Sequence, residues 1–246
     1  MGLKEAGLRG SLRSVSTGVP PIPDSDIFQN PIYRFGYWEV NESDGTSPFD
    51  LPEVIAGLSD ATAVGGPTYN TDQEGTAAGE YDGVDDGHDV SADSQHPSGN
   101  EDISVAALVY PRNATDEQNI YTYGDSGEPG IRIESGIIDG EVSMGGVGSG
   151  FPLAQGGTVP TDEWITMGGL TDSNTAEMSA VLNGSFVATD SNDESDVTDD
   201  NHSIAYNASI DGSYANVFIG DMIICDGTES EAAFQEYHDE WMQRLG

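Results

Sequence analysis

Four aspartates within one eight-residue stretch form a candidate cation site. They are Asp82, Asp85, Asp86 and Asp89. Calcium favours clustered carboxylate oxygens, although this spacing does not match the loop of an EF-hand. The alternative is an acidic turn that is simply surrounded by water. Calcium or another cation is therefore a candidate ligand, and no cofactor is expected to be required.

The acid pair that glycoside hydrolysis requires is missing from the sequence. Retaining hydrolysis needs two carboxyl groups about 5 Å apart, and alternate positions on one strand place both on the same face. No stretch has the pattern Glu-x-Asp-x-Glu or Glu-x-Asp-x-x-Glu. Asp162 and Glu163 are adjacent, so their side chains would point to opposite faces of a strand.

Other catalytic patterns are missing as well. The four histidines, at positions 88, 96, 202 and 238, form no metal-binding pair with helical spacing. No Gly-x-Ser-x-Gly elbow occurs, and the glycine-rich stretch 145–150 lacks the lysine of a phosphate loop. These absences predict that the protein is not an enzyme.

Five Asn-x-Ser/Thr sequons are candidate glycosylation sites on an exposed surface. They begin at Asn41, Asn113, Asn183, Asn201 and Asn207. Asn183 precedes Gly184 in a predicted hairpin turn, so the shape of the backbone is an alternative reason for its presence.

Charge is the strongest compositional signal. The 246 residues include 44 acidic and seven basic ones, which gives a formal net charge of −37. Such a surface repels itself in ordinary buffer, but at 1 M salt the Debye length falls to about 3 Å and the repulsion is screened. The composition therefore indicates adaptation to brine. It argues against nucleic-acid binding, which needs basic groups to replace phosphate counterions.

Residues 1–28 are predicted to form an extended N-terminal docking arm. They contain Lys4, Arg9 and Arg13, three of the seven basic residues. The proline-rich stretch 19–24 disfavours helix and central strand. Positive charge on an otherwise acidic chain would complement an acidic partner. The alternative is a terminal segment without a role.

Residues 29–246 are predicted to form one all-β domain with a C-terminal helix. Alternating and β-branched runs predict strands, and residues 41–102 are expected to be mainly loop with short turns. The predicted strands are 32–40, 103–110, 120–123, 131–134, a weaker pair within 136–150, 163–170, 177–182, 184–188, 204–210 and 217–225.

The predicted helix covers about 229–245. Phe234, Tyr237, Trp241 and Leu245 repeat at the spacing of one helical face, so this face is expected to pack on the sandwich. Thr228-x-x-Glu231 fits a capping box at its start.

The order of these segments resembles the concanavalin A-like lectin/glucanase (laminin-G-like) family. The resembling stretches are 60–69, 81–86, 103–111, 161–164, 182–184 and 219–227, followed by the acidic helix. This resemblance implies a jelly-roll β-sandwich over about 31–246. The family usually has an aromatic residue after Asp86, where this chain has Gly87-His88, so no ligand contact is carried over. Residues 7–18 resemble the N-terminal arms of structural proteins of tailed viruses of haloarchaea.

These features lead to the hypothesis of a virion structural protein of a haloarchaeal tailed virus. The resemblance implies a capsid turret, decoration subunit or tail fibre, made in the host cytoplasm and exposed to hypersaline medium. Expected partners are other virion proteins through the arm, further copies in a trimer or pentamer, and a host surface glycan. The sequence has no stretch of 18 apolar residues, so no membrane insertion is expected. One alternative is a carbohydrate-binding or adhesion module of a halophilic cell surface. A second is a degenerate glycoside hydrolase.

Overall fold

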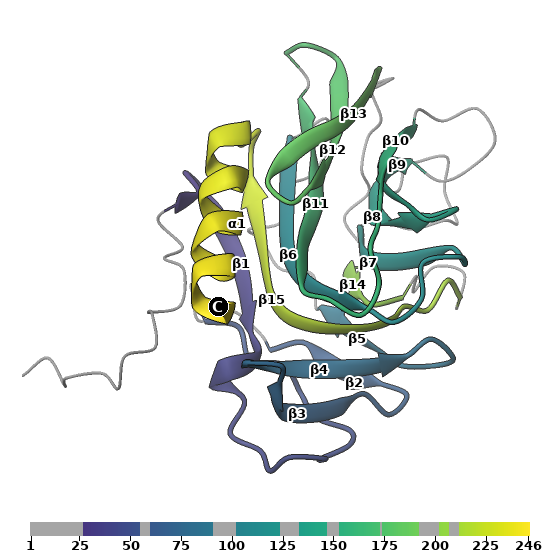
Figure 1. Cartoon of the computed structure of the whole chain (residues 1–246), viewed down its shortest axis with the longest axis vertical. Helices are drawn as coiled ribbons and strands as arrows, with labels where there is room; N and C mark the ends of the chain where they lie inside the picture. Colours follow the sequence, from purple (N-terminus) through teal and green to yellow (C-terminus); the bar gives the residue numbers. More distant parts are fainter. Residues whose placement is uncertain are drawn as a thin grey trace, which may run out of the picture.

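The computed structural model describes residues 27–54, 60–90, 102–123, 133–146, 153–172, 174–191, 202–206 and 212–246. Within these ranges the chain forms two antiparallel β-sheets, a short 3-10 helix and one α-helix (Figure 1). The eight-stranded sheet contains β1 (Pro31–Gly36), β3 (Thr68–Gln73), β4 (Thr76–Asp82), β6 (Ile103–Pro111), β11 (Ile165–Asp172), β12 (Glu177–Leu182), β13 (Ser185–Ser191) and β15 (Asn216–Asp226). The seven-stranded sheet contains β2 (Thr62–Val64), β5 (Gly87–Val90), β7 (Gln118–Tyr123), β8 (Ile133–Ile138), β9 (Glu141–Gly146), β10 (Leu153–Thr158) and β14 (His202–Ile204).

The two sheets enclose one hydrophobic core, which confirms the predicted jelly-roll β-sandwich with a C-terminal helix. The first sheet runs in the order β13-β12-β11-β6-β15-β4-β3, with β1 beside β15, and the second in the order β10-β9-β8-β7-β14-β5-β2. Alternate residues of each strand, such as Val105 of β6 and Tyr121 of β7, point into the space between the sheets. The arm proposed for residues 1–28 lies mostly outside the described residues, so its boundary stays a prediction.

Strand β6 is buried along its whole length because both of its faces are covered. Val105 and Val109 belong to the core between the sheets, whereas Ala106 and Leu108 contact the group of residues beneath helix α1 (Glu231–Leu245). A strand covered on both sides can be continuously apolar. This explains why the run 103–110 is the clearest strand in the sequence.

Several predicted strands differ from those in the structure. The run expected at 32–40 ends at Gly36 and continues as a 3-10 helix over Tyr37–Glu39. The region expected to be mainly loop contains β2, β3, β4 and β5, because short polar strands can be held by pairing with distant partners. The predicted hairpin at Asn183-Gly184 is confirmed, and both residues have positive φ, of 49° and 78°.

Helix α1 packs on the outer face of the eight-stranded sheet, beside β1 and β15 (Figure 1). Phe234, Tyr237 and Trp241 are buried, which confirms the predicted apolar face. The predicted capping box is wrong. Ser230 is the N-cap, and its side chain accepts a hydrogen bond from the backbone of Ala233. The described ranges contain no helix with the length and apolar character needed to cross a membrane.

A buried carboxylate joins this helix to the sheet. Asp221 of β15 accepts hydrogen bonds from Arg34 through Nε at 3.1 Å and Nη2 at 2.8 Å. The hydroxyl of Tyr237 and the indole nitrogen of Trp241 also donate to it, at 3.1 and 3.2 Å. One side chain therefore links β1, β15 and α1.

Candidate functional site

The acidic turn between β4 and β5 is the candidate functional site. Strand β4 belongs to the eight-stranded sheet and β5 to the seven-stranded sheet, so residues 82–86 cross the rim of the sandwich. The ligand-type oxygens of Asp82, Asp85 and Asp86 lie within 4.8 Å of one another. The structure thus brings together three of the four aspartates proposed as cation ligands.

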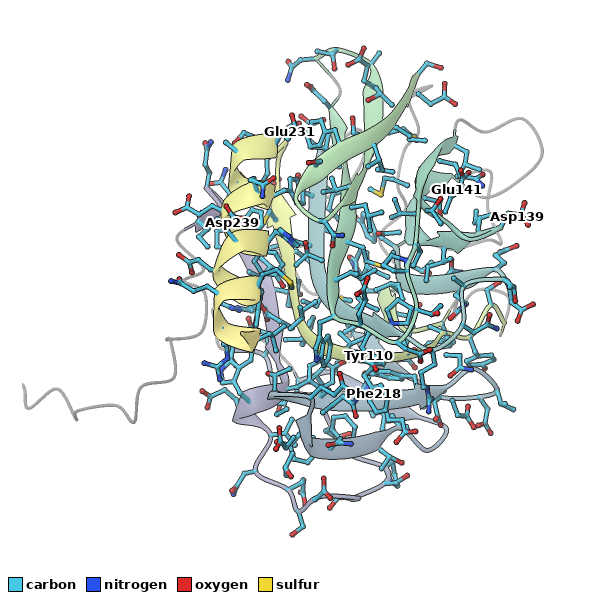
Figure 2. The ribbon with its side chains drawn as sticks, viewed as in Figure 1. Tyr110, Asp139, Glu141, Phe218, Glu231 and Asp239 are labelled. Atoms are coloured by element: carbon cyan, nitrogen blue, oxygen red, sulfur yellow. The ribbon has the colours of Figure 1, made fainter. Side chains whose placement is uncertain are left out.

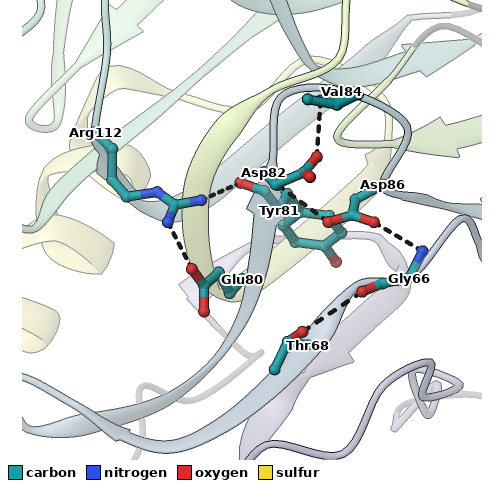
Figure 3. Close-up of polar contacts among 8 residues, drawn as sticks. All are labelled: Gly66, Thr68, Glu80, Tyr81, Asp82, Val84, Asp86 and Arg112. Atoms are coloured by element: carbon teal, nitrogen blue, oxygen red, sulfur yellow. Dashed lines mark hydrogen bonds and ion pairs between the residues drawn. The ribbon is translucent and has the colours of Figure 1, made fainter.

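Asp86 holds the turn in place, and both of its carboxylate oxygens accept backbone hydrogen bonds in doing so. It is only 6% exposed. Its Oδ1 accepts from the backbone of Gly66 at 2.7 Å and its Oδ2 from the backbone of Asp82 at 3.1 Å (Figure 3). Burial raises the pKa of Asp86, and the nearby Asp82 and Asp85 add to this, against the two hydrogen bonds.

A glycine loop supports the turn from behind. Gly65 has a φ of 68°, and a methyl group on it would collide with the main-chain carbonyl of Asp85. The carbonyl of Gly66 accepts hydrogen bonds from the hydroxyls of Ser47 at 2.7 Å and Thr68 at 3.5 Å. Three chain segments far apart in sequence therefore fix the shape of the turn.

The outer side of the turn faces water. Asp82 and Asp85 are exposed, and Val84 between them is 68% exposed. Asp82 Oδ1 accepts from the backbone of Val84 at 2.8 Å, whereas no hydrogen bond to its other oxygen or to the carboxylate of Asp85 is seen within the described ranges. Such oxygens can bind a hard cation or accept hydrogen bonds from hydroxyl groups. Calcium binding here stays a prediction.

Asp89 is separated from the other three aspartates. Its carboxylate accepts a hydrogen bond from the hydroxyl of Tyr206. The ring of Tyr206 lies against Gly87, where an added methyl group would collide with it, and stacks on Tyr214 with the centroids 5.4 Å apart. Because Asp89 follows Gly87 and His88 on strand β5, it contributes to the outer face of the seven-stranded sheet and not to the turn.

Arg112 is a member of this rim that sequence analysis missed. Its guanidinium donates to Glu80 Oε1 and to the carbonyl of Tyr81, both at 2.6 Å (Figure 3). It also lies over the ring of Phe218, 4.9 Å from the centroid. The sequence did offer a signal for Arg112, because it is one of only seven basic residues in an acidic chain. A partly buried arginine needs a polar or acidic partner.

His88 lies behind the turn and is fully buried. Its Nε2 donates to the carbonyl of Phe49 at 2.8 Å, so its Nδ1 must accept from the hydroxyl of Tyr81 at 2.9 Å. Burial lowers the pKa of His88 to about 4. The imidazole is therefore neutral at pH 7, and both nitrogens are engaged within the core.

The described sequons differ in accessibility. Asn41 is exposed. Asn113 is half-buried, with its amide bound to Asp116 and its oxygen to Thr115. Asn183 is half-buried in the hairpin turn and accepts from the backbone of Thr166. Asn201, Asn207 and the arm residues Lys4, Arg9 and Arg13 lie outside the described residues.

Aromatic side chains do not supply an open platform in the part of the chain that the structure describes. The large hydrophobic residues exposed there are Val54 and Val84. Trp164, on the outer face of the eight-stranded sheet, packs edge-on against Tyr110 with the centroids 5.5 Å apart, and its indole donates to the carbonyl of Gln73. Within these ranges, the structure therefore presents no exposed aromatic surface for stacking.

Comparison with known proteins finds no matching family model and no matching curated protein. Solved structures match in fold. Domain 4 of AbnA, a GH43 extracellular arabinanase from Geobacillus stearothermophilus, in complex with arabinotriose, has a TM-score of 0.63 at 14% identity, over 85% of this chain and 98% of that one. The binding domain of Paraclostridial Mosquitocidal Protein 1 has a TM-score of 0.64 at 9% identity, over 86% of this chain and 52% of that one.

The receptor-binding domain of botulinum neurotoxin D is also similar. Its TM-score is 0.61 at 14% identity, over 87% of this chain and 53% of that one. The chain therefore spans about half the length of the mosquitocidal-protein and neurotoxin structures and nearly all of the arabinanase domain. At these identities the likeness is one of fold.

Proposed function

We propose that this domain is a non-catalytic module that binds surface glycans. The observation that carries the proposal is that the fold of this chain matches 98% of a domain described in complex with arabinotriose. The other two structures are the binding domain of a mosquitocidal protein and the receptor-binding domain of a neurotoxin. The exposed carboxylates of Asp82 and Asp85 would supply acceptors for sugar hydroxyls, either directly or through a cation.

The more specific proposal places this module on the virion of a haloarchaeal tailed virus, as a turret, decoration subunit or tail fibre. The net charge of −37 supports work in brine. Residues 1–28 would dock the module to other virion proteins, and the glycan-binding rim would face outward. A trimer or pentamer of the module would multiply weak glycan contacts through avidity.

Glycan binding can be measured with a glycan array and then by calorimetry, in about 3 M NaCl to screen the surface charge. We expect at least one oligosaccharide to bind with a dissociation constant between roughly 1 μM and 1 mM. Asp85→Asn should weaken that binding at least tenfold, or by about 1.4 kcal/mol, because it removes an exposed carboxylate of the rim.

Asp139→Asn is the matched control. Asp139 is an exposed aspartate in the β8–β9 turn (Figure 2), outside residues 82–86, and asparagine tolerates its φ of 51°. If no glycan binds in a saturable way, the proposed function is refuted. If Asp85→Asn and Asp139→Asn lose the same amount of glycan affinity, the β4–β5 turn is not the binding site. Release of reducing sugar would show catalysis and contradict a non-catalytic module.

Deleting residues 1–26 should abolish recovery of the protein with purified particles, with at least a tenfold drop relative to the full chain. The unfolding free energy should change by only about 0.5 kcal/mol, because Phe28 and the backbone contacts of Gln29 and Asn30 are kept. The measurements are particle-associated protein by mass spectrometry and urea unfolding.

A full-length control separates charge from length. Replacing Lys4, Arg9 and Arg13 by glutamine keeps the arm and removes its cations, so the same loss is expected. Normal incorporation of the deleted protein would contradict a docking role for the arm.

A further inference from the structure

The three sequons in the described ranges differ in what holds the acceptor amide. In the sequon at Asn113, Nδ2 donates to Asp116 Oδ2 at 2.7 Å, and Oδ1 accepts from the backbone and the hydroxyl of Thr115 at 2.9 and 2.8 Å. Thr115 is the third residue of that sequon. The amide nitrogen and the hydroxyl that define this sequon are therefore both engaged within the folded chain.

The sequon at Asn183 is held by a hairpin turn against the terminal helix. Asn183 is half-buried with a φ of 49°, and its Oδ1 accepts from the backbone of Thr166 at 3.3 Å. A methyl group on the next residue, Gly184, would lie 2.7 Å from the Cα of Gln235 in α1. One side of this sequon is therefore closed by the helix, and its backbone shape is set by the turn.

The sequon at Asn41 is open. Asn41, Glu42 and Ser43 are all exposed and lie in neither a helix nor a strand. Within the described ranges, no hydrogen bond to the Asn41 amide or to the Ser43 hydroxyl is seen. The two side-chain groups that define this sequon therefore face solvent and have no such contact to break before they react.

The residues on both sides of this sequon hold its loop in place. Val40, the preceding residue, is 8% exposed and belongs to the core between the sheets. After the sequon, the backbone of Gly45 donates to the carbonyl of Tyr69, and the backbone of Tyr69 donates to the carbonyl of Thr46, both at 2.8 Å. Tyr69 lies on β3, and Figure 1 shows the loop projecting beyond that strand. An enzyme can therefore take up the sequon while the sheet stays paired.

We propose that Asn41 is an acceptor for N-linked glycosylation in the folded protein. The donor is a lipid-linked oligosaccharide, and an oligosaccharyltransferase carries out the transfer. Nδ2 of Asn41 forms a bond to the anomeric carbon of the sugar, the bond from that carbon to the lipid phosphate oxygen breaks, and the amide gives up one proton to a base of the enzyme. The lipid phosphate is the leaving group. The inference goes beyond the proposed function, because the chain carries this glycan covalently and does not recognise it.

The test uses the purified full chain, folded in about 3 M NaCl, with an oligosaccharyltransferase from a salt-adapted archaeon and its lipid-linked oligosaccharide. The modification rate of each site is measured by glycopeptide mass spectrometry and divided by the rate of a synthetic peptide with the same sequon. This division removes the preference of the enzyme for one sequon over another. We expect the ratio to be at least about tenfold higher at Asn41 than at Asn113 or Asn183, because freeing those two amides costs hydrogen bonds.

Substitutions of Ser43 are matched controls within the exposed loop. Ser43→Ala keeps Asn41 and its surroundings but removes the hydroxyl of the sequon, so the modification of Asn41 should be lost. Ser43→Thr keeps a hydroxyl at the same position, and the modification should be retained. Asp116→Ala removes the acceptor that holds the amide nitrogen of Asn113 and should raise the ratio at that site.

Other results overturn the proposal. Equal ratios at the three sites would show that burial and hydrogen bonding do not select the acceptor. If the peptide is modified at Asn41 and the folded chain is not, the loop does not fit the enzyme. If neither is modified, Asn41-Glu42-Ser43 is not an acceptor sequence. Glycan binding by the rim is measured on the unmodified chain, so none of these results bears on it.

Discussion

Asp221→Asn is expected to lower the unfolding free energy by about 3–5 kcal/mol, because it leaves a buried arginine charge without its counter-ion. The side chains of Arg34 and Asp221 are 5% and 0% exposed. Asparagine has the same shape but no charge, and two other donors, Tyr237 and Trp241, share the same carboxylate oxygen. A typical domain is stable by only 5–15 kcal/mol, so this loss is a large part of the total.

Urea unfolding at constant high salt measures the effect, since urea adds no ionic strength. Glu80→Gln is the matched control because it also removes the carboxylate partner of an arginine, but in a pair whose side chains are 28% and 34% exposed. That change should cost at most about 1 kcal/mol. Similar losses in both variants would contradict the view that Asp221 holds α1 on the sheet.

Lowering the salt concentration is expected to unfold the domain. The net charge of −37 makes the folded state repel itself, and in the described ranges Asp82, Asp85 and Asp86 crowd three carboxylates together. Most of the change should fall between roughly 1 M and 0.1 M NaCl, where the Debye length grows from about 3 Å to about 10 Å. Circular dichroism during stepwise dilution follows the loss of strand signal.

Sucrose is the control for this experiment. It strengthens burial by exclusion from the surface but does not screen charge, so it should not replace NaCl. Asp85→Asn removes one of the crowded charges and should move the midpoint to a lower salt concentration. At 0.1 M NaCl the Debye length is about 10 Å, so charge screening is refuted as the cause if the fold persists unchanged there. An equal rescue by sucrose would refute it as well.

Long apolar strands and the terminal helix could be predicted from sequence because their signals are local. The run 103–110 and the Asn183-Gly184 hairpin appear in the structure as expected. Strand β2 was missed because it has only three residues, none of them buried. Strand β3 was missed because polar residues dominate it and only Tyr69 is buried. Strand β2 is held by backbone pairing with β5, and β3 by backbone pairing with β4, so both form although their composition does not predict a strand.

The candidate site was predictable in part for the same reason. Neighbours in sequence, Asp82, Asp85 and Asp86, are necessarily close in space, and the structure keeps them together. The glycine loop that binds Asp86 lies twenty residues away, and Arg112 lies thirty-two residues from Glu80. Contacts at such separations depend on how the strands are ordered, which local patterns do not encode.

The sequence by itself determined an acidic, cysteine-poor chain with alternating strands and an amphipathic terminal helix, because composition and periodicity are properties of neighbouring residues. Only the tertiary structure decided that the carboxylate of Asp221 is buried on the outer side of the sheet. Val217 and Ile219 face the core, and strict alternation would put Asp221 with them. A register shift between Ile219 and Asp221 turns the carboxylate to the outer face, under α1. Strand β15 pairs with β4 before the register shift and with β1 after it. Both partner strands are distant in the chain, so the position of the Asp221 carboxylate could not be predicted from neighbouring residues.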